Sequence, residues 1–191
     1  MSITDLNLVE QDPFAGKEYD ICICGAGPAG ITLARKLSSD FEVCLLEAGG
    51  MEFSRQSQNF YIGTNTGTPY FGLEHCRLRY FGGASGHWGG SCRLLDPEDF
   101  THKGFEKYSG WPINHTDLEP YTAETRSILD VKPCSSDIQL DADKQWLPPL
   151  NGHEETQFWL SKPTQFGPKY ADEIRANDHV HCFVNANVTD I

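Results

Sequence analysis

The chain reads Tyr19-Asp20-Ile21-Cys22-Ile23-Cys24-Gly25-Ala26-Gly27-Pro28-Ala29-Gly30 near its beginning, where an apolar run leads through three spaced glycines into a helical pattern. Gly25 permits a tight turn, Gly27 lets the backbone approach a pyrophosphate, and Gly30 allows a helix to pack closely on a strand. Pro28 suits the first helical turn, where a missing N–H costs nothing. Unpaired amides and the helix dipole favour an anion there. The stretch therefore predicts a dinucleotide-binding loop.

The residues after this loop have the order of a strand–helix–strand unit. Apolar side chains recur at helical spacing up to Leu37, and Ser38-Ser39-Asp40 then ends the helix. A second apolar run, Phe41-Glu42-Val43-Cys44-Leu45-Leu46, leads into Glu47. A carboxylate at this place accepts both hydroxyls of an adenosine ribose and repels a 2′-phosphate, which disfavours NADP. The alternative interpretation of Glu47 is a solvated charge at a strand end.

Length and composition describe an acidic globular chain. It has 191 residues, of which 39% are hydrophobic and 12% aromatic, and a formal net charge of −12 at pH 7. Such a surface repels nucleic acid and anionic membranes. The first residues carry no basic and apolar signal sequence, and no run reaches membrane-spanning length. We therefore expect a cytoplasmic protein with no nucleic-acid partner and no membrane partner.

The cysteines and histidines give no sign of a disulfide framework or a metal site. The seven cysteines are Cys22, Cys24, Cys44, Cys76, Cys92, Cys134 and Cys182, an odd and dispersed set. We expect the first three to be buried within strands, where cysteine behaves as a small hydrophobe. His102, His115 and His153 lack metal-ligand spacing, so we expect them at the surface and predict no metal.

A second glycine-rich segment runs from Arg79 to Arg93 and reads Arg-Tyr-Phe-Gly-Gly-Ala-Ser-Gly-His-Trp-Gly-Gly-Ser-Cys-Arg. Glycines at this density disfavour an ordinary strand or helix, and they permit the backbone to lie against a flat ligand. We expect an aromatic ring system to fit such a surface. Trp88 suits either packing against that ring or filling the core.

Motifs along most of the chain resemble one family. They are Cys24-Gly25-Ala26-Gly27-Pro28-Ala29-Gly30, Leu46-Glu47-Ala48-Gly49, Gly82-Gly83-Ala84-Ser85-Gly86-His87-Trp88-Gly89-Gly90, Leu95-Asp96-Pro97-Glu98-Asp99-Phe100, Ser109-Gly110-Trp111-Pro112 and Asn185-Ala186-Asn187-Val188. In this order they resemble the N-terminal part of the glucose–methanol–choline (GMC) oxidoreductases, FAD-dependent enzymes that oxidise alcohols and sugars. The resemblance implies an α/β, Rossmann-like FAD-binding domain with a parallel sheet and helices.

The resemblance also implies roles for particular residues. The FAD pyrophosphate would be held by Gly25, Gly27 and Gly30. The adenosine ribose would be bound by Glu47, and the adenine would contact the Val188 backbone. The isoalloxazine would be lined by Gly82 to Gly90. The full set of implied cofactor-binding residues is Gly25, Ala26, Gly27, Pro28, Gly30, Glu47, Ala48, Gly82, Gly83, Ser85, His87, Trp88, Gly89, Gly90 and Val188. No catalytic residue is assigned, because the family's histidine base belongs to a later part of its enzymes.

His87 carries an additional implication. The pattern Gly-Gly-x-Ser-x-His-Trp is similar to a pyranose oxidase segment whose histidine bears the flavin covalently, so FAD attached through His87 is one expectation. A non-covalent hydrogen bond from His87 to the flavin or backbone is the other. In many family members an Asn follows the paired glycines and no His-Trp occurs. The chain therefore resembles the branch of pyranose oxidases and bacterial sugar dehydrogenase-like enzymes.

The predicted organisation has three parts. Residues 1–100 form the FAD-binding core with the flavin loop, residues 101–165 begin a substrate or cap region with a helix over 117–129 and a loop over 146–152, and residues 166–191 return to the FAD-binding domain. The run from Val180 to Ile191 reads as extended, apolar-rich structure that stops without a capping element. We therefore expect an incomplete sheet and an N-terminal portion that is inactive alone.

These observations predict an oxidoreductase that, at full length, transfers hydride from CH–OH groups of alcohols or sugars to FAD. Its expected partner is a small-molecule alcohol or sugar. Two alternatives stay open at this stage. One is a stand-alone or inactive FAD-binding module, and the other is a nicotinamide-binding protein that uses the same glycine loop.

Overall fold

A computed structural model of the chain describes residues 3–131 and 158–190. The contacts divide into two compact units, the first formed by Met1–Trp88 with Gln165–Ile191 and the second by Gly89–Thr164. The functional division after residues 100 and 165 stays a prediction. The expected loop over 146–152 and His153 lie outside the described residues.

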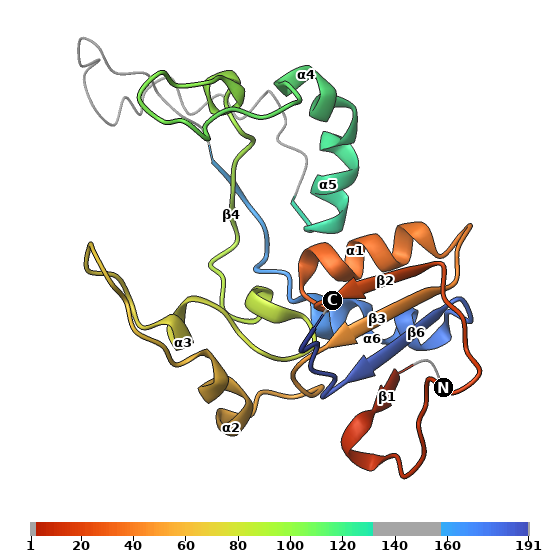
Figure 1. Cartoon of the computed structure of the whole chain (residues 1–191). Helices are drawn as coiled ribbons and strands as arrows, with labels where there is room; N and C mark the ends of the chain where they lie inside the picture. The colour runs from red at the N-terminus through yellow and green to blue at the C-terminus, as the bar shows by residue number, and fades with distance from the viewer. Residues whose placement is uncertain (1–2, 132–157, 191) are drawn as a thin grey trace. The chain divides into compact units, whose positions relative to one another are not determined.

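The first unit contains a parallel sheet and its helices. Its elements are β1 (Ile3–Asp5), η1 (Leu6–Leu8), β2 (Ile21–Cys24), α1 (Pro28–Leu37), β3 (Val43–Glu47), α2 (Arg55–Gln58), η2 (Asn59–Tyr61), α3 (Leu73–Cys76), η3 (Gly83–Gly86), α6 (Phe166–Ala176) and β6 (Val180–Val184). The four strands are parallel and ordered β1-β6-β3-β2, with Ile23 beside Leu45 and Leu45 beside Cys182. Figure 1 shows β2, β3 and β6 pointing the same way. The predicted α/β, Rossmann-like fold is confirmed.

Helix α1 begins and ends where the sequence predicts. Gly27 is the N-cap, Pro28 occupies the first turn, and the N–H of Ser38 closes the last turn on Ala34 O. The buried residues of α1 are Gly30, Ile31 and Ala34, and the missing side chain of Gly30 lets the helix approach the sheet. The strand–helix–strand unit therefore follows from local signals alone.

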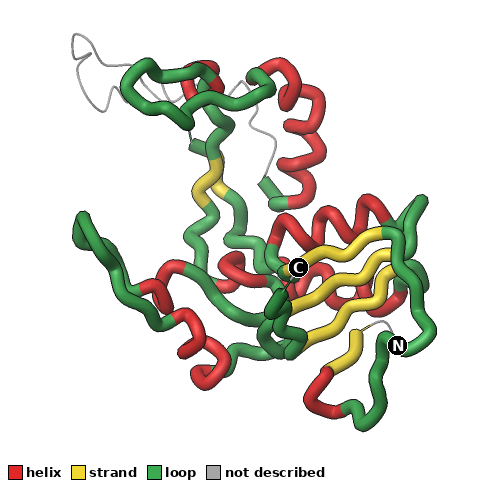
Figure 2. Tube along the Cα trace, viewed as in Figure 1, coloured by secondary structure: helices red, strands yellow, loops and turns green. Residues whose placement is uncertain are grey.

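Helix α6 packs beside α1. Arg35 Nε lies 2.6 Å from Glu173 Oε1, and the Arg35 guanidinium stacks 4.0 Å from the centre of the Tyr170 ring. The two helices and the strands enclose a core whose largest fully buried side chains include Ile31, Leu45, Phe166 and Ile174. Figure 2 shows these helices along the sheet.

The opposite side of the sheet corrects one expectation. Cys44 is buried as predicted, but Cys22 and Cys24 are exposed. Ile23 lies toward α1, since its Cγ2 is 3.3 Å from the Cβ position of Gly30, so strand alternation sends both cysteines to the other face. Among the described residues, the Phe14 ring covers part of that face, and its centroid lies 4.5 Å from the centroid of the Phe183 ring. The strand composition alone does not tell which face is covered.

The end of the described chain also differs from the prediction. Strand β6 ends at Val184, and Asn185 adopts a left-handed φ of 57°. The extended run predicted up to Ile191 therefore stops at Asn185. The backbone turns back instead, and the N–H groups of Asn185 and Ala186 donate to Gly49 O at 2.7 Å and to Glu47 O at 2.9 Å.

The second unit is built from short elements. They are β4 (Ser91–Cys92), η4 (Pro97–Phe100), α4 (His115–Leu118), η5 (Glu119–Tyr121), α5 (Thr122–Ile128) and β5 (Trp159–Leu160), with β4 and β5 antiparallel. The predicted helix over 117–129 is present as α4, η5 and α5, interrupted where Pro120 lacks an N–H. The Arg126 guanidinium stacks 3.9 Å from the centre of the Trp159 ring. In residues 3–131 and 158–190, no helix is long and apolar enough to cross a membrane.

Gly30→Ala should destabilise the fold strongly. A Cβ at this position would lie 1.9 Å from Gly25 O and 3.1 Å from Gly25 C, so α1 or the loop must move. We expect a loss of about 1–3 kcal/mol in the free energy of unfolding, measured by urea denaturation. Gly104→Ala is the matched control, because a Cβ there meets no atom within 4 Å. Equal stability of the two variants would contradict the close approach.

Candidate functional site

The glycine loop joins the end of β2 to the first turn of α1. Gly25 has a φ of 105°, a conformation that favours glycine, and its N–H donates to Leu46 O at 2.6 Å. A Cβ on Gly27, in contrast, would meet no atom within 4 Å. The backbone of Gly27 is therefore open on its side-chain side, as close approach of a ligand requires. The first-turn amides of α1 have no partner four residues earlier within the helix, which suits an anion.

Glu47 ties this loop to the end of β3. Its side chain is buried, with Oε2 accepting from Ala26 N at 2.8 Å and Oε1 accepting from Gly49 N at 2.8 Å. The solvated strand-end charge considered from the sequence is therefore wrong. Each carboxylate oxygen has a second lone pair, so binding of ribose hydroxyls by Glu47 stays a prediction. The carboxylate therefore has a structural role, which its place at the end of β3 does not by itself indicate.

The start of the second glycine-rich segment packs on the first loop. Gly82 N donates to Ala26 O at 2.8 Å, and a Cβ on Gly83 would lie 3.0 Å from the Cα of Gly27. Both residues have positive φ angles, 98° for Gly82 and 54° for Gly83. The 3-10 helix η3 follows directly. The structure therefore brings the two predicted glycine motifs into contact.

Ser85 joins this segment to α6. Its buried hydroxyl donates to Gly82 O at 2.6 Å and accepts from Phe166 N at 2.9 Å. A Cβ on Gly82 would lie 2.5 Å from Gly167 N, so the start of α6 rests directly on the glycines. Ser85, assigned to the cofactor from the sequence, is engaged with backbone groups in the described structure.

His87 follows η3 as its C-cap residue. It is exposed and helps to line a cavity of about 190 Å³ together with Phe53, Glu74, His75 and Leu78. None of the residues lining this cavity belongs to the loop over Gly25–Gly30. Attachment of a flavin to His87 is untested and stays a prediction.

The other predicted flavin-facing residues divide between the two units. Trp88 is half-buried and belongs to the first unit, whereas Gly89 and Gly90 belong to the second. Gly90 O accepts from Ser161 N at 2.8 Å, and a Cβ on Gly90 would lie 2.6 Å from Ser161 O. A side chain at position 90 would therefore clash with the backbone of Ser161, whether or not a flavin binds there.

A polar cavity of about 570 Å³ lies where β1, β3 and β6 end. Ala48 and Gly50 follow β3, Asn185 and Asn187 follow β6, and Asp5 ends β1. The carboxyl ends of parallel strands are where α/β folds bind ligands, and the volume suits a small molecule. Val188, the predicted adenine contact, is 41% exposed just beyond Asn187.

Arg79 lines this cavity and was not assigned from the sequence. It is buried, and its guanidinium donates to Ser57 Oγ and to Asn187 Oδ1. The available signal was its position three residues before Gly82. A cation placed directly before a glycine-rich segment is a weak signal, because most arginines are solvated.

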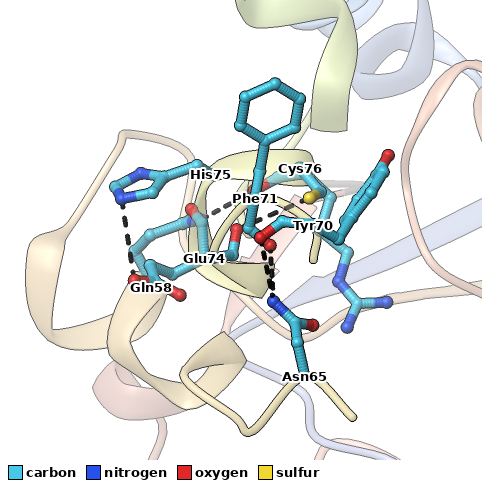
Figure 3. A network of polar contacts seen from close by, with 9 residues as sticks. Gln58, Asn65, Tyr70, Phe71, Glu74, His75 and Cys76 are labelled. Carbon is cyan, nitrogen blue, oxygen red and sulfur yellow. Dashed lines mark hydrogen bonds and ion pairs between the residues drawn. The ribbon is translucent and has the colours of Figure 1, made fainter. Parts of the chain in front are cut away.

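Gln58 holds the backbone around Arg79 in place. Its buried amide donates to Glu74 O at 2.6 Å and to Arg77 O at 2.7 Å, and its Oε1 accepts from Arg79 N at 3.0 Å. Figure 3 shows Gln58 beside Glu74 in this network, with Asn65 bonded to the carbonyl groups of Tyr70 and Phe71. The loop that leads to Arg79 is therefore fixed by one buried side chain.

Two ionisable groups near the site are held neutral. Burial, reinforced by the negative charge of Glu47, raises the pKa of the Cys182 thiol to about 12. Burial also raises the pKa of Tyr80, with a smaller contribution from Glu52. Neither group is prepared to act as a nucleophile or base at neutral pH. Across the described parts of the chain, no group of three or more His, Cys, Asp or Glu side chains is arranged to hold a metal ion.

Comparisons with known proteins find two relatives in Arabidopsis thaliana. The chain is 32% identical to the protein HOTHEAD over 106 residues, which cover 49% of this chain and 17% of HOTHEAD. It is 33% identical to a protein named (R)-mandelonitrile lyase-like over 106 residues, which cover 48% of this chain and 19% of that protein. No protein-family profile matches the chain.

The matched stretch thus covers less than one fifth of the length of either relative. Both relatives are GMC oxidoreductases, and the similarity is of low identity over half of the chain. This supports the resemblance to the family as a whole. The pyranose oxidase branch stays a prediction.

Glu47→Gln should destabilise the protein even without a ligand. The substitution replaces one acceptor oxygen by an NH₂ group that faces a backbone N–H, and it removes the charge from both hydrogen bonds. We expect a loss of about 1.5–3 kcal/mol in the free energy of unfolding, measured by urea denaturation. Glu18→Gln, at an exposed position, is the control. A Glu47→Gln protein as stable as this control would refute the tie between the loop and β3.

Proposed function

We propose that the chain is the FAD-binding, N-terminal portion of an oxidoreductase that oxidises CH–OH groups of alcohols or sugars. One observation carries the proposal. Three hydrogen bonds hold the glycine loop in place. Ala26 N donates to the Glu47 carboxylate, Gly25 N donates to Leu46 O, and Ala26 O accepts from Gly82 N. What stays open is the side of Gly27, above the N-terminus of α1. This is the arrangement that a bound pyrophosphate needs.

The residues present fit the dinucleotide half of FAD. The pyrophosphate would sit at Gly25, Gly27 and the first turn of α1, with Ala26 and Pro28 shaping the loop. Glu47 would receive ribose hydroxyls through its remaining lone pairs. Ala48 directly follows β3, and Val188 lies four residues after the end of β6. The adenine would extend along this edge of the sheet.

The flavin side of the proposal rests on the second glycine segment. Gly82 and Gly83 lie against the loop at Gly27, which suits a flat ring that continues from the pyrophosphate. When bound, FAD supplies an electron-pair acceptor for a hydride from the substrate carbon. The protein's contribution here is to bind and orient that cofactor and to exclude water from it.

The substrate is proposed as a small-molecule alcohol or sugar. The CH–OH donor is proposed from the family resemblance of the motifs alone. The name of one relative, (R)-mandelonitrile lyase-like, also admits a lyase activity on a hydroxynitrile. The base that accepts the hydroxyl proton is proposed to lie outside these residues. No ionisable group around the described glycine loop is assigned to that step.

The full-length protein should be yellow when purified. We expect a flavin absorbance spectrum, release of FAD rather than NAD on denaturation, and oxidation of alcohols or sugars with a dye as electron acceptor. Glu47→Ala should reduce the affinity for FAD on the order of 10- to 100-fold, the loss of a charge-assisted hydrogen bond. A colourless protein that binds NAD would replace this proposal by the nicotinamide alternative, and a flavoprotein without turnover would replace it by the binding module.

The attachment through His87 has a separate test. Acid-precipitated protein should remain yellow if the histidine carries the flavin, because a covalently linked flavin stays with the denatured chain, whereas a non-covalently bound flavin is released. His87→Ala should then release the colour into the supernatant, while His75→Ala, at the neighbouring histidine of the same cavity, should not. Colour lost from the unsubstituted protein would exclude the covalent bond and leave FAD binding itself intact.

A further inference from the structure

Arg126 carries a buried donor without an acceptor. Its Nε is the one buried side-chain nitrogen or oxygen atom in residues 3–131 and 158–190 that has no hydrogen-bond partner. In the same residues, no carboxylate oxygen lies within 4.0 Å of the Arg126 guanidinium. The two Nη nitrogens also lack an acceptor among the described residues, but they are open to solvent. Buried polar atoms of native proteins nearly always have a partner, so this exception calls for a physical reason.

The carboxylate at pairing distance along the helix is engaged elsewhere. Asp130 follows Arg126 by four residues, the spacing at which an arginine and a carboxylate pair on a helix. Helix α5 ends at Ile128, however, and Asp130 adopts a left-handed φ of 52°. Its Oδ2 accepts from Thr164 Oγ1 at 2.6 Å and lies 3.5 Å from Lys162 Nζ. The turn after α5 therefore leaves the guanidinium of Arg126 without this partner.

Trp159 holds the guanidinium in place before any ligand arrives. The Cζ atom of Arg126 lies over the Trp159 ring, 3.9 Å from its centre, a contact that stabilises a cation. Trp159 is fixed in turn, because β5 pairs with β4 and places Trp159 opposite Cys92. The backbone of Arg126 is fixed as well, since its carbonyl accepts from Val131 N at 2.9 Å. The side chain therefore loses little rotamer entropy when it meets a ligand.

The geometry and charge of the donors decide which chemical group fits. An aromatic ring offers no acceptor lone pair, so the contact with Trp159 leaves the N–H groups of Arg126 available. These groups form a planar fork that matches the two oxygens of a carboxylate. A phosphate dianion carries a second charge, and a chain with a formal net charge of −12 repels it more strongly than a single charge. The guanidinium therefore favours a monocarboxylate.

We propose that Arg126, held against Trp159, binds the carboxylate group of a small organic acid. Its Nη nitrogens donate to the two carboxylate oxygens. The negative charge of the ligand then offsets the desolvation of a half-buried cation, which no described carboxylate offsets in the ligand-free protein. The proposal goes beyond the proposed function, because both residues belong to the second unit and neither belongs to the glycine loop.

The experiment uses the full-length protein and two sugars that differ at one carbon. D-glucuronate has a carboxylate where D-glucose has a hydroxymethyl group, so the difference between their affinities reports on the carboxylate. In calorimetric titration, glucuronate should bind the unsubstituted protein more tightly than glucose does. Arg126→Met should weaken glucuronate binding on the order of 10- to 100-fold, as expected for the loss of a charge-assisted pair. The affinity for glucose should not change.

Arg93→Met is the matched control. Arg93 also lies over an aromatic ring, 6.0 Å from the centre of the Phe158 ring, but its Nη2 already has a carboxylate partner in Asp96 Oδ2 at 2.5 Å. Its replacement should leave glucuronate binding unchanged. If Arg126→Met fails to fold, Arg126→Lys takes its place. Lysine keeps the charge but lacks the planar fork, so the affinity for glucuronate should fall about tenfold.

Each outcome supports or overturns the carboxylate site. Equal glucuronate affinity in Arg126→Met and Arg93→Met overturns it, as does an unsubstituted protein that does not bind glucuronate. A loss of the same size for glucose and glucuronate also overturns it, because Arg126 then supports the fold and not the carboxylate. Displacement of glucuronate by an equal concentration of inorganic phosphate overturns the choice of a monocarboxylate. The flavin spectrum tests the proposed function separately, since a colourless protein that binds glucuronate through Arg126 overturns FAD binding and supports this site.

Discussion

The two hydrogen bonds of the Glu47 carboxylate organise the first unit. One reaches Ala26 in the glycine loop and the other reaches Gly49 in the turn after β3. Since Ala26 O also accepts from Gly82 N, and Gly49 O accepts from Asn185 N, four segments far apart in the sequence meet around one buried side chain. Charge-assisted bonds to backbone amides are strong where water is excluded. The carboxyl edge of the sheet depends on them for its shape.

The sequence predicts those parts of this arrangement whose requirements are local. The left-handed turn at Gly25 and the close contact at Gly30 demand glycine whatever surrounds them, and the periodicity of α1 and β3 is visible in a single pass. The position of Glu47 follows from the lengths of these elements. Its bonding partners do not, because they are set by the turn that brings Gly49 N back toward the carboxylate.

Other features depend on contacts between distant segments. The burial of Arg79 comes from α2, through Ser57 and Gln58, and no periodic pattern in the sequence indicates it. The exposure of Cys22 depends on what covers one face of the sheet, which an apolar strand does not reveal. His87 lies in a short motif with a clear resemblance, yet its surroundings come from Phe53, Glu74 and His75. A short motif therefore identifies a residue, but it does not predict which side chains from distant segments surround that residue in the fold.

The net charge of the chain and the local field at the glycine loop act on an anion in opposite directions. A chain with a formal charge of −12 repels anions at long range, although this repulsion is screened beyond about 8–10 Å at physiological salt. Around the glycine loop the local attraction comes from backbone amides and the dipole of α1, not from side-chain cations. The nearby cavity instead offers Arg79 among carboxylates and amides. The field near the carboxyl ends of the strands is therefore set by these local groups, because salt screens the repulsion from the rest of the acidic surface.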